Sequence, residues 1–362
     1  MNGGAHSDQV TAASEPQPGT NVFRAIGTAN HGYGQQAQEE VRRLFETKTS
    51  FRWLLPNETF MMEADTAFAD GLERIKRSEP VFLRHLQPVN AEVDWDGDEA
   101  ALLEGIRSVI RTTGDTRSGL RVAVQIRKGE RVPEGAAPGQ LKPAIDRLLT
   151  EEWSAEPVVR EADRILSLFL EGGRAYVGWS RPKDNLSDWP GGAVRFRREE
   201  GQISRAKFKL LEAELAFGLD FAGYRSALDV GAAPGGWTSL LLERGLEVTA
   251  VDPAKLDPSL LRHPRLTYYG KRADEVSFAQ GSFDLLVCDM SWSPHQMAKL
   301  VLGLADALQQ GGTAILTVKL MHKKALQTIR EVTGVLESSF ALQKAKQLFH
   351  NREELTLFLL KK

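Results

Sequence analysis

A glycine-rich loop followed at a fixed distance by an aspartate is the strongest chemical signal in the chain. Glycines let a backbone turn sharply and approach a ligand closely, and a helix N-terminus offers free N–H groups to a carboxylate. Asp252 lies 21 positions after Gly231, the distance at which an acid can accept hydrogen bonds from ribose hydroxyls. The pattern predicts a nucleoside-binding site. The loop residues expected to form it are Gly231, Ala233, Pro234, Gly235, Gly236 and Trp237.

Two further aspartates follow later strands of the same region. Asp274 comes after the apolar segment 266–269, and Asp289 directly follows the segment 285–288. Aspartates after strands are often only turn or cap residues. In a parallel sheet, however, these positions meet at the edge where ligands bind. We therefore expect Asp274 near an adenine amino group and Asp289 in the site itself.

Other ligands and cofactors fit the pattern less well. The loop is not G-x-G-x-x-G, and Pro234 removes one N–H donor from it, which argues against a nicotinamide or flavin pyrophosphate. A purely structural glycine turn is the remaining alternative. The seven histidines and one cysteine show no metal-ligand spacing, so no metal is expected.

The elements that must position these residues alternate regularly between strand and helix. This alternation predicts an α/β domain with a parallel, doubly wound sheet of seven strands. The last two strands have no helix between them and should form a hairpin at one edge. The expected strands are 227–230, 247–251, 266–269, 285–288, 313–318, 341–348 and 355–360.

The first half of the chain has a different, α+β character. Its expected strands are 22–28, 58–63, 81–89, 120–127 and the hairpin 164–170 with 174–179, and its expected helices are 35–47, 64–77, 99–112 and 143–150. The predicted organisation is a disordered leader (1–20), two α+β regions (21–90 and 91–180), a basic connector (181–200) and the α/β domain (201–362). The connector is compatible with a plain linker or with an RNA-contacting segment.

Bulk composition narrows the function classes. The hydrophobic fraction of 42% allows a normal core. One cysteine, Cys288, excludes an internal disulfide and fits a reducing, cytoplasmic location. The net charge of −2 argues against nucleic-acid binding by bulk charge alone. No apolar run of about 18 residues is present, so no membrane partner is expected.

Five ordered segments of the second half resemble the FtsJ/RrmJ family of ribose 2′-O-methyltransferases, most closely the branch that modifies a cytidine of large-subunit ribosomal RNA. Together they cover about residues 180–362, and one position departs from that branch, with Asn351 in place of aspartate. The segments are 204–212 (SRAKFKLLE), 229–237 (DVGAAPGGW), 287–290 (VCDM) with Pro294, 318–320 (VKL) with Lys323 and Lys324, and 350–356 (HNREELT).

The resemblance implies a class I, Rossmann-like methyltransferase that uses S-adenosyl-L-methionine and acts on RNA. It places a catalytic tetrad on Lys209, Asp289, Lys319 and Glu354, with Lys319 as the general base. A lysine base needs a pKa lowered toward neutrality, by burial or by a neighbouring ammonium such as that of Lys209. Lys319 also follows an apolar strand, where a charge is expensive without a purpose.

Several assignments stay open within the resemblance. Lys209 taken alone fits a surface lysine of an amphipathic helix, and Glu353 competes with Glu354 for the tetrad position. Trp292 could stack on the target base or cover the cofactor. Cys288 is expected in the core without a catalytic role.

The resemblance also implies contacts outside the tetrad. Ser204 joins the expected cofactor residues, and phosphate contacts are expected from basic residues near the site. The N-terminal half would combine a ferredoxin-like fold with a THUMP RNA-binding module. The basic residues are Arg195, Arg197, Arg205, Lys207, Lys323, Lys324 and Arg352.

Three rival functions remain at this stage. One is a catalytically silent RNA-binding or ribosome assembly factor that kept the fold, although it would have no need of both lysines. Another is a methyltransferase for another RNA, a base or a protein, although 289–292 (DMSW) is not the N-P-P-Y motif of many base-directed enzymes. The third, a nicotinamide oxidoreductase, is disfavoured by the loop. The sequence identifies neither the modified nucleotide nor the oligomeric state.

Overall fold

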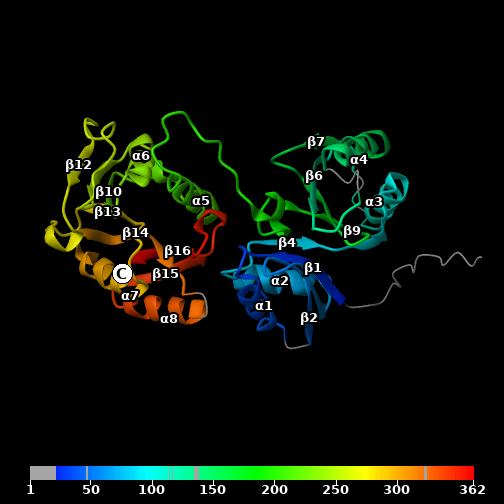
Figure 1. Cartoon of the computed structure of the whole chain (residues 1–362), viewed down its shortest axis with the longest axis horizontal. Coiled ribbons are helices and arrows are strands. Elements are labelled where there is room, and N and C mark those ends of the chain that lie inside the picture. Colours follow the sequence, from blue (N-terminus) through cyan, green and yellow to red (C-terminus); the bar gives the residue numbers. More distant parts are fainter. Residues whose placement is uncertain (1–21, 46–47, 114, 116, 134–137, 322–323) are drawn as a thin grey trace, which may run out of the picture.

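The computed structural model describes residues 22–45, 48–113, 115, 117–133, 138–321 and 324–362. Its strands form three sheets. Figure 1 shows the two N-terminal sheets on the right, in blue to green, and the C-terminal sheet on the left, in yellow to red, joined by the green connector.

The first sheet has four strands in the order β2-β3-β1-β4. Helices α1 and α2 (Gly34–Arg42 and Phe68–Ser78) pack on it through buried residues such as Val41 and Ile75. The sequence predicted a helix from residue 64, but β3 continues to Asp65 because that residue still pairs with Val22. The strands are β1 (Val22–Thr28), β2 (Thr49–Leu55), β3 (Thr59–Asp65) and β4 (His85–Pro88).

The second sheet has five strands in the order β5-β9-β8-β6-β7, with α3 (Glu99–Thr113) and α4 (Pro138–Trp153). The predicted hairpin between β8 and β9 is confirmed, and its turn uses Gly172 and Gly173 at φ 59° and 76°, which suit glycine. The strands are β5 (Ala91–Asp94), β6 (Arg121–Lys128), β7 (Glu156–Val158), β8 (Arg164–Glu171) and β9 (Arg174–Ser180).

The connector is held against the first half by specific bonds. Its short helical turns are η1 (Pro182–Asp184) and η2 (Pro190–Gly192). Asp184 pairs with Lys76 at 3.2 Å, and the amide of Gln125 donates to the Asp188 carbonyl at 2.7 Å. The beginning of the connector is therefore part of the N-terminal structure.

The third sheet has seven strands in the order β12-β11-β10-β13-β14-β16-β15. All neighbours are parallel except β16, which runs antiparallel to both β14 and β15. The predicted seven-stranded, mostly parallel sheet is confirmed. The strands are β10 (Ser226–Val230), β11 (Glu247–Val251), β12 (Leu266–Tyr269), β13 (Phe283–Cys288), β14 (Leu308–Lys319), β15 (Phe340–Lys346) and β16 (Glu354–Lys361).

Helices cover both faces of this sheet. Alternate residues of β13 point to opposite faces, so Leu286 packs in the cluster of α7 and α8, and Val287 in that of α5 and α6. The helices are α5 (Lys207–Phe217), α6 (Gly236–Glu243), α7 (Pro294–Gly303) and α8 (Ala325–Leu336). In the described part of the chain, no helix combines the length and apolarity needed to cross a membrane.

Candidate active site

A cleft of about 260 Å³ opens at the carboxyl ends of β10, β11 and β13. Gly231 follows β10 at φ +76°, and a Cβ there would lie 2.5 Å from the Cγ of Met290. Only glycine lets the backbone reach the cleft at this point. Residues lining the cleft include Val230, Gly231, Ala233, Val251, Asp252, Arg272, Ala273, Asp289, Met290 and Trp292.

Asp252 connects the glycine loop to the next strand. One carboxylate oxygen accepts the Ala233 N–H at 3.0 Å, and the other accepts the Ala254 N–H at 2.8 Å. The side chain is half-buried and faces the cleft. A carboxylate held this way can accept further hydrogen bonds from ligand hydroxyls.

The other loop residues support the cleft from behind. Trp237 is buried and donates its indole N–H to the Ala206 carbonyl at 2.8 Å, which ties α6 to the beginning of α5. Ser204 lies against Gly236, where a Cβ would come 3.0 Å from the serine Cβ. Pro234, Gly235, Gly236, Trp237 and Ser204 were predicted to bind the cofactor, but they do not line this cleft.

Asp274 lies at the rim of the cleft. Its carboxylate is exposed and pairs with Arg272 at 2.8 Å, so its pKa is held below the ordinary value chiefly by that hydrogen bond. The Arg272 guanidinium stands 5.6 Å from the centre of the Trp292 ring. Arg272 and Trp292 line the cleft and Asp274 does not. Of the two roles considered for Trp292, this position favours covering the cofactor.

The charged residues predicted from distant segments meet beside the cleft. The Lys209 ammonium on α5 contacts Asp289 at 2.9 Å and Glu354 at 2.6 Å. Thr317 donates its hydroxyl to Asp289 at 2.7 Å. These three charged side chains are 15 to 21% exposed. We call Lys209, Asp289 and Glu354 the charge cluster.

Burial and charge act in opposite directions within the charge cluster. Burial alone would lower the pKa of Lys209, but the two carboxylates outweigh it and the pKa lies above the ordinary lysine value. Burial raises the pKa of Glu354, and Lys209 offsets part of that rise. Lys209 therefore stays protonated near neutral pH.

Lys319 lies next to the cluster, at the end of β14, where it is the register partner of Glu354. Its side chain is exposed. A charge at this position is not costly, contrary to the expectation from the apolar strand, because Lys319 is the last residue of β14 and reaches solvent. Glu354, rather than Glu353, contacts Lys209. The Glu353 carbonyl accepts the Leu320 N–H at 2.8 Å.

Most of the predicted phosphate-contacting residues are exposed. Lys207 is an exception: it is 6% exposed and pairs with Glu199 and Glu243 at 3.0 and 2.8 Å, so it is not available to RNA. Lys323 lies outside the described residues. The exposed ones are Arg195, Arg197, Arg205, Lys324 and Arg352.

Three features of the site were not singled out from the sequence. Thr317 lies two residues before Lys319, and this same-face spacing could have indicated it. Asp229 is fully buried below the loop and accepts the Thr238 hydroxyl at 2.6 Å. Arg272 had no distinguishing pattern. Cys288 is buried as expected, and burial raises the pKa of its thiol.

Comparison with known proteins defines the class. The FtsJ-like methyltransferase family matches residues 202–348. The cleft fits an adenosyl ligand, since it combines a half-buried carboxylate, close backbone approach at Gly231 and apolar walls. The catalytic domain is thus that of a methyltransferase with S-adenosylmethionine as its cofactor.

Curated relatives define the family more narrowly. Ribosomal RNA large subunit methyltransferase M of Methylococcus capsulatus is 34% identical over 68% of each chain. The protein of the same name from Aromatoleum aromaticum is 30% identical over 83% of each chain. The chain belongs to this family. Three further relatives of that name align over 54 to 60% of their own length.

The search of solved structures found a weaker likeness. TrmN from Thermus thermophilus aligns over 94% of this chain and 99% of its own, with 14% identity and a TM-score of 0.39.

Proposed function

We propose that this protein transfers the methyl group of S-adenosylmethionine to a ribose 2′-hydroxyl of RNA, and that its substrate is large-subunit ribosomal RNA. The observation that carries the proposal is the charge cluster next to the cleft, with Lys319 opposite Glu354 in the sheet. The names of the relatives support the choice of RNA.

The reaction needs a base, because a ribose hydroxyl is a weak acid and a weak nucleophile. Lys209 is committed to two carboxylates and keeps its proton. Lys319 ends β14 opposite Glu354, beside the charge cluster, and we assign it as the group that accepts the hydroxyl proton.

The carboxylates would orient the reacting groups. Asp289 belongs to both the cleft and the charge cluster. Its carboxylate would therefore lie between the cofactor and the attacking hydroxyl. The negative charge of Glu354 would hold the side chain of Lys319 in place. Holding two reactants in line can supply about 7–11 kcal/mol of the barrier reduction. No further chemistry is required of the protein.

The cofactor would be held by the residues of the cleft. Asp252 would accept ribose hydroxyls, and the main chain at Gly231 and Ala233 would lie against the ligand. S-adenosylmethionine supplies an electrophilic methyl group on its sulfonium. Asp274 would contribute to the adenine end only from the rim.

RNA would approach over the exposed cations around the site. Arg195 and Arg197 of the connector, Arg205 before α5 and Arg352 before β16 are all exposed. Such side chains contact phosphates and make binding dependent on salt. They would position the RNA without reading its sequence.

The test is mass spectrometry of nucleosides from total RNA of cells with and without the protein. The expected result is the loss of one 2′-O-methylated nucleoside on deletion, which wild type restores and Lys319→Ala does not. With purified protein, Lys319→Ala should slow transfer by about 10²–10⁴-fold, with cofactor affinity unchanged by calorimetry. A methylated base in place of a methylated ribose would refute the reaction. No change in any methylated nucleoside would favour a silent RNA-binding factor.

A further inference from the structure

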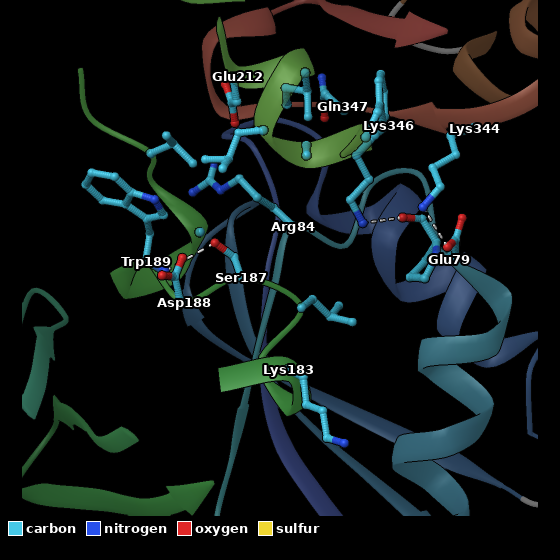
Figure 2. A pocket seen from close by; sticks show the side chains of 18 of the residues that line it. Glu79, Arg84, Lys183, Ser187, Asp188, Trp189, Glu212, Lys344, Lys346 and Gln347 are labelled. Carbon is cyan, nitrogen blue, oxygen red and sulfur yellow. Dashed lines mark hydrogen bonds and ion pairs between the residues drawn. The ribbon is translucent and has the colours of Figure 1, made fainter. Parts of the chain in front are cut away.

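A cavity of about 630 Å³ lies between the first sheet, the connector and the catalytic domain. Figure 2 shows Arg84 near its centre, between Glu212 of the catalytic domain and the connector around Trp189, with Lys346 and Lys344 on the opposite side. Contacts along this cavity join the N-terminal half to the end of β15 and to the segment that follows it.

That segment is the 347–353 turn, which connects the end of β15 to the beginning of β16 and so leads directly to Glu354. The N-terminal half contacts the beginning of this turn and the last residue of β15. The Gln347 N–H donates to the Val81 carbonyl at 2.9 Å. The Lys346 ammonium donates to the carbonyls of Pro80 and Leu83 at 2.7 and 2.8 Å.

Asn30, in the loop after β1, holds the turn near its beginning, at Leu348. It is 6% exposed, and its side-chain N–H donates to the Leu348 carbonyl at 2.8 Å. The oxygen of the same amide accepts a hydrogen bond from Arg84. Arg84 therefore fixes which end of the Asn30 amide faces the turn, because the oxygen must face the guanidinium.

Arg84 is itself fixed from two sides. It donates to the Gly191 carbonyl of the connector at 3.0 Å, and its guanidinium stands 5.1 Å from the centre of the Phe349 ring in the turn. Burial lowers the pKa of Arg84 to about 10, so it remains charged near neutral pH. A buried charge bound to carbonyl oxygens gives a stiff contact, since leaving it unpaired is costly.

The catalytic domain also binds the turn. The Glu212 carboxylate accepts the N–H groups of Phe349 and His350 at 2.8 and 2.9 Å. Glu212 lies on α5 three residues after Lys209, on the same side of the helix. The turn is thus tied both to the helix that carries Lys209 and to the strand that begins with Glu354.

We propose that Asn30, oriented by Arg84, is a positioning residue for methyl transfer, and that it holds Glu354 against Lys209 by fixing the 347–353 turn from the N-terminal half. The proposal rests on the proposed function for its effect on catalysis. The structural part of the proposal, that Asn30 fixes the turn, does not depend on the proposed function. The N-terminal half would then take part in assembling the charge cluster.

The first measurement is amide hydrogen exchange of the full-length protein without RNA. Asn30→Ala should speed exchange in the 347–353 turn about tenfold, as expected for a local opening made easier by one lost hydrogen bond. The matched control is Lys344→Ala, which removes an exposed ion pair to Glu79 across the same interface and should leave the turn unchanged. Unchanged exchange in Asn30→Ala would overturn the proposal.

The second measurement separates positioning from general stability. Asn30→Ala should lower kcat about tenfold, as one lost hydrogen bond predicts, and leave KM for RNA and the cofactor Kd unchanged. In a Glu354→Gln background the same substitution should have almost no further effect, because it acts through Glu354. An equal loss in both backgrounds would refute the role.

Asn30→Asp covers the case in which Asn30→Ala does not fold. It keeps the acceptor for Arg84 but puts a carboxylate oxygen, which cannot donate, against the Leu348 carbonyl. Repulsion between these oxygens adds to the lost hydrogen bond, so both effects should be at least as large as in Asn30→Ala, and their absence would also overturn the proposal. If the wild type transfers no methyl group to RNA, the proposed function fails, while the exchange experiment still decides whether Asn30 fixes the turn.

Discussion

The cofactor cleft and the charge cluster lie side by side at one edge of the sheet and share Asp289, yet they are built in different ways. The cleft depends on backbone geometry at Gly231 and on Asp252, which accepts backbone N–H groups. The charge cluster depends on side-chain ion pairs, and Lys209 and Glu354 are 145 positions apart.

Because of this difference, we expect cofactor affinity and the rate of methyl transfer to respond to different substitutions. Backbone contacts fix the shape of a ligand site, so changes in the cleft should alter affinity. In the proposed mechanism the charge cluster lies beside the reacting hydroxyl, so changes there should alter the chemical step. The next three predictions test this separation, from the largest expected effect to the smallest.

Lys209→Ala should cause the largest loss. It leaves the carboxylates of Asp289 and Glu354 together without the cation that lies between them, so their mutual repulsion should disrupt the arrangement proposed to hold the reacting hydroxyl. We expect single-turnover transfer to fall about 10²–10³-fold while the cofactor Kd stays within about threefold. A loss confined to cofactor affinity would show that the two parts are not separate.

Asp252→Ala should act on binding. Losing the carboxylate proposed to accept ribose hydroxyls should weaken cofactor affinity about 10- to 100-fold by calorimetry, with little change in kcat at saturating cofactor. Asp274→Ala should cause a smaller loss, because its carboxylate is paired with Arg272 at the rim. Equal losses would mean that Asp274 turns into the cleft when the cofactor binds.

Asp229→Asn should have the smallest effect on activity and a distinct effect on stability. Burial raises the pKa of Asp229 from 3.8 to about 7. The folded protein therefore binds more protons than the unfolded chain between these values, and the free energy of unfolding falls as pH rises through this window. Asparagine keeps the acceptor for Thr238 and removes the titration.

The measurement is urea unfolding at about pH 5 and about pH 8. The wild type should lose more stability between these conditions than Asp229→Asn does. Glu212, whose pKa burial raises to about 7, should keep part of the slope in the variant. Identical slopes in both proteins would show that Asp229 does not titrate in this range.

The edge of the sheet at which the cleft opens was predictable because its signals are local. The glycine loop, Asp252 and the strands around them lie within a few dozen residues, and their order fixes the edge at which they meet. The contacts among Lys209, Asp289 and Glu354 could be expected only through a family resemblance, since nothing in the spacing of such distant residues shows that they touch.

The wrong predictions also arose where the local sequence pattern does not show which segments come together in the fold. Lys207 has the pattern of a solvent-exposed helix residue, but Glu199 and Glu243 cover it. In the first half, the short strands β2, β5 and β7 were not predicted, because edge strands lack a clear alternation of buried and exposed residues. The THUMP assignment of that half stays a prediction.

The reversed direction of β16 also makes the length of the 347–353 turn part of the site. Because β16 runs against β14, it contributes its first residue to the edge where β14 ends, and Lys319 stands opposite Glu354. Inserting one residue in the turn would shift the register and present Glu353 in place of Glu354, and deleting one would present Leu355, so either change removes the carboxylate opposite Lys319 from its place. Length changes should therefore be tolerated less here than in loops at the opposite edge of the sheet.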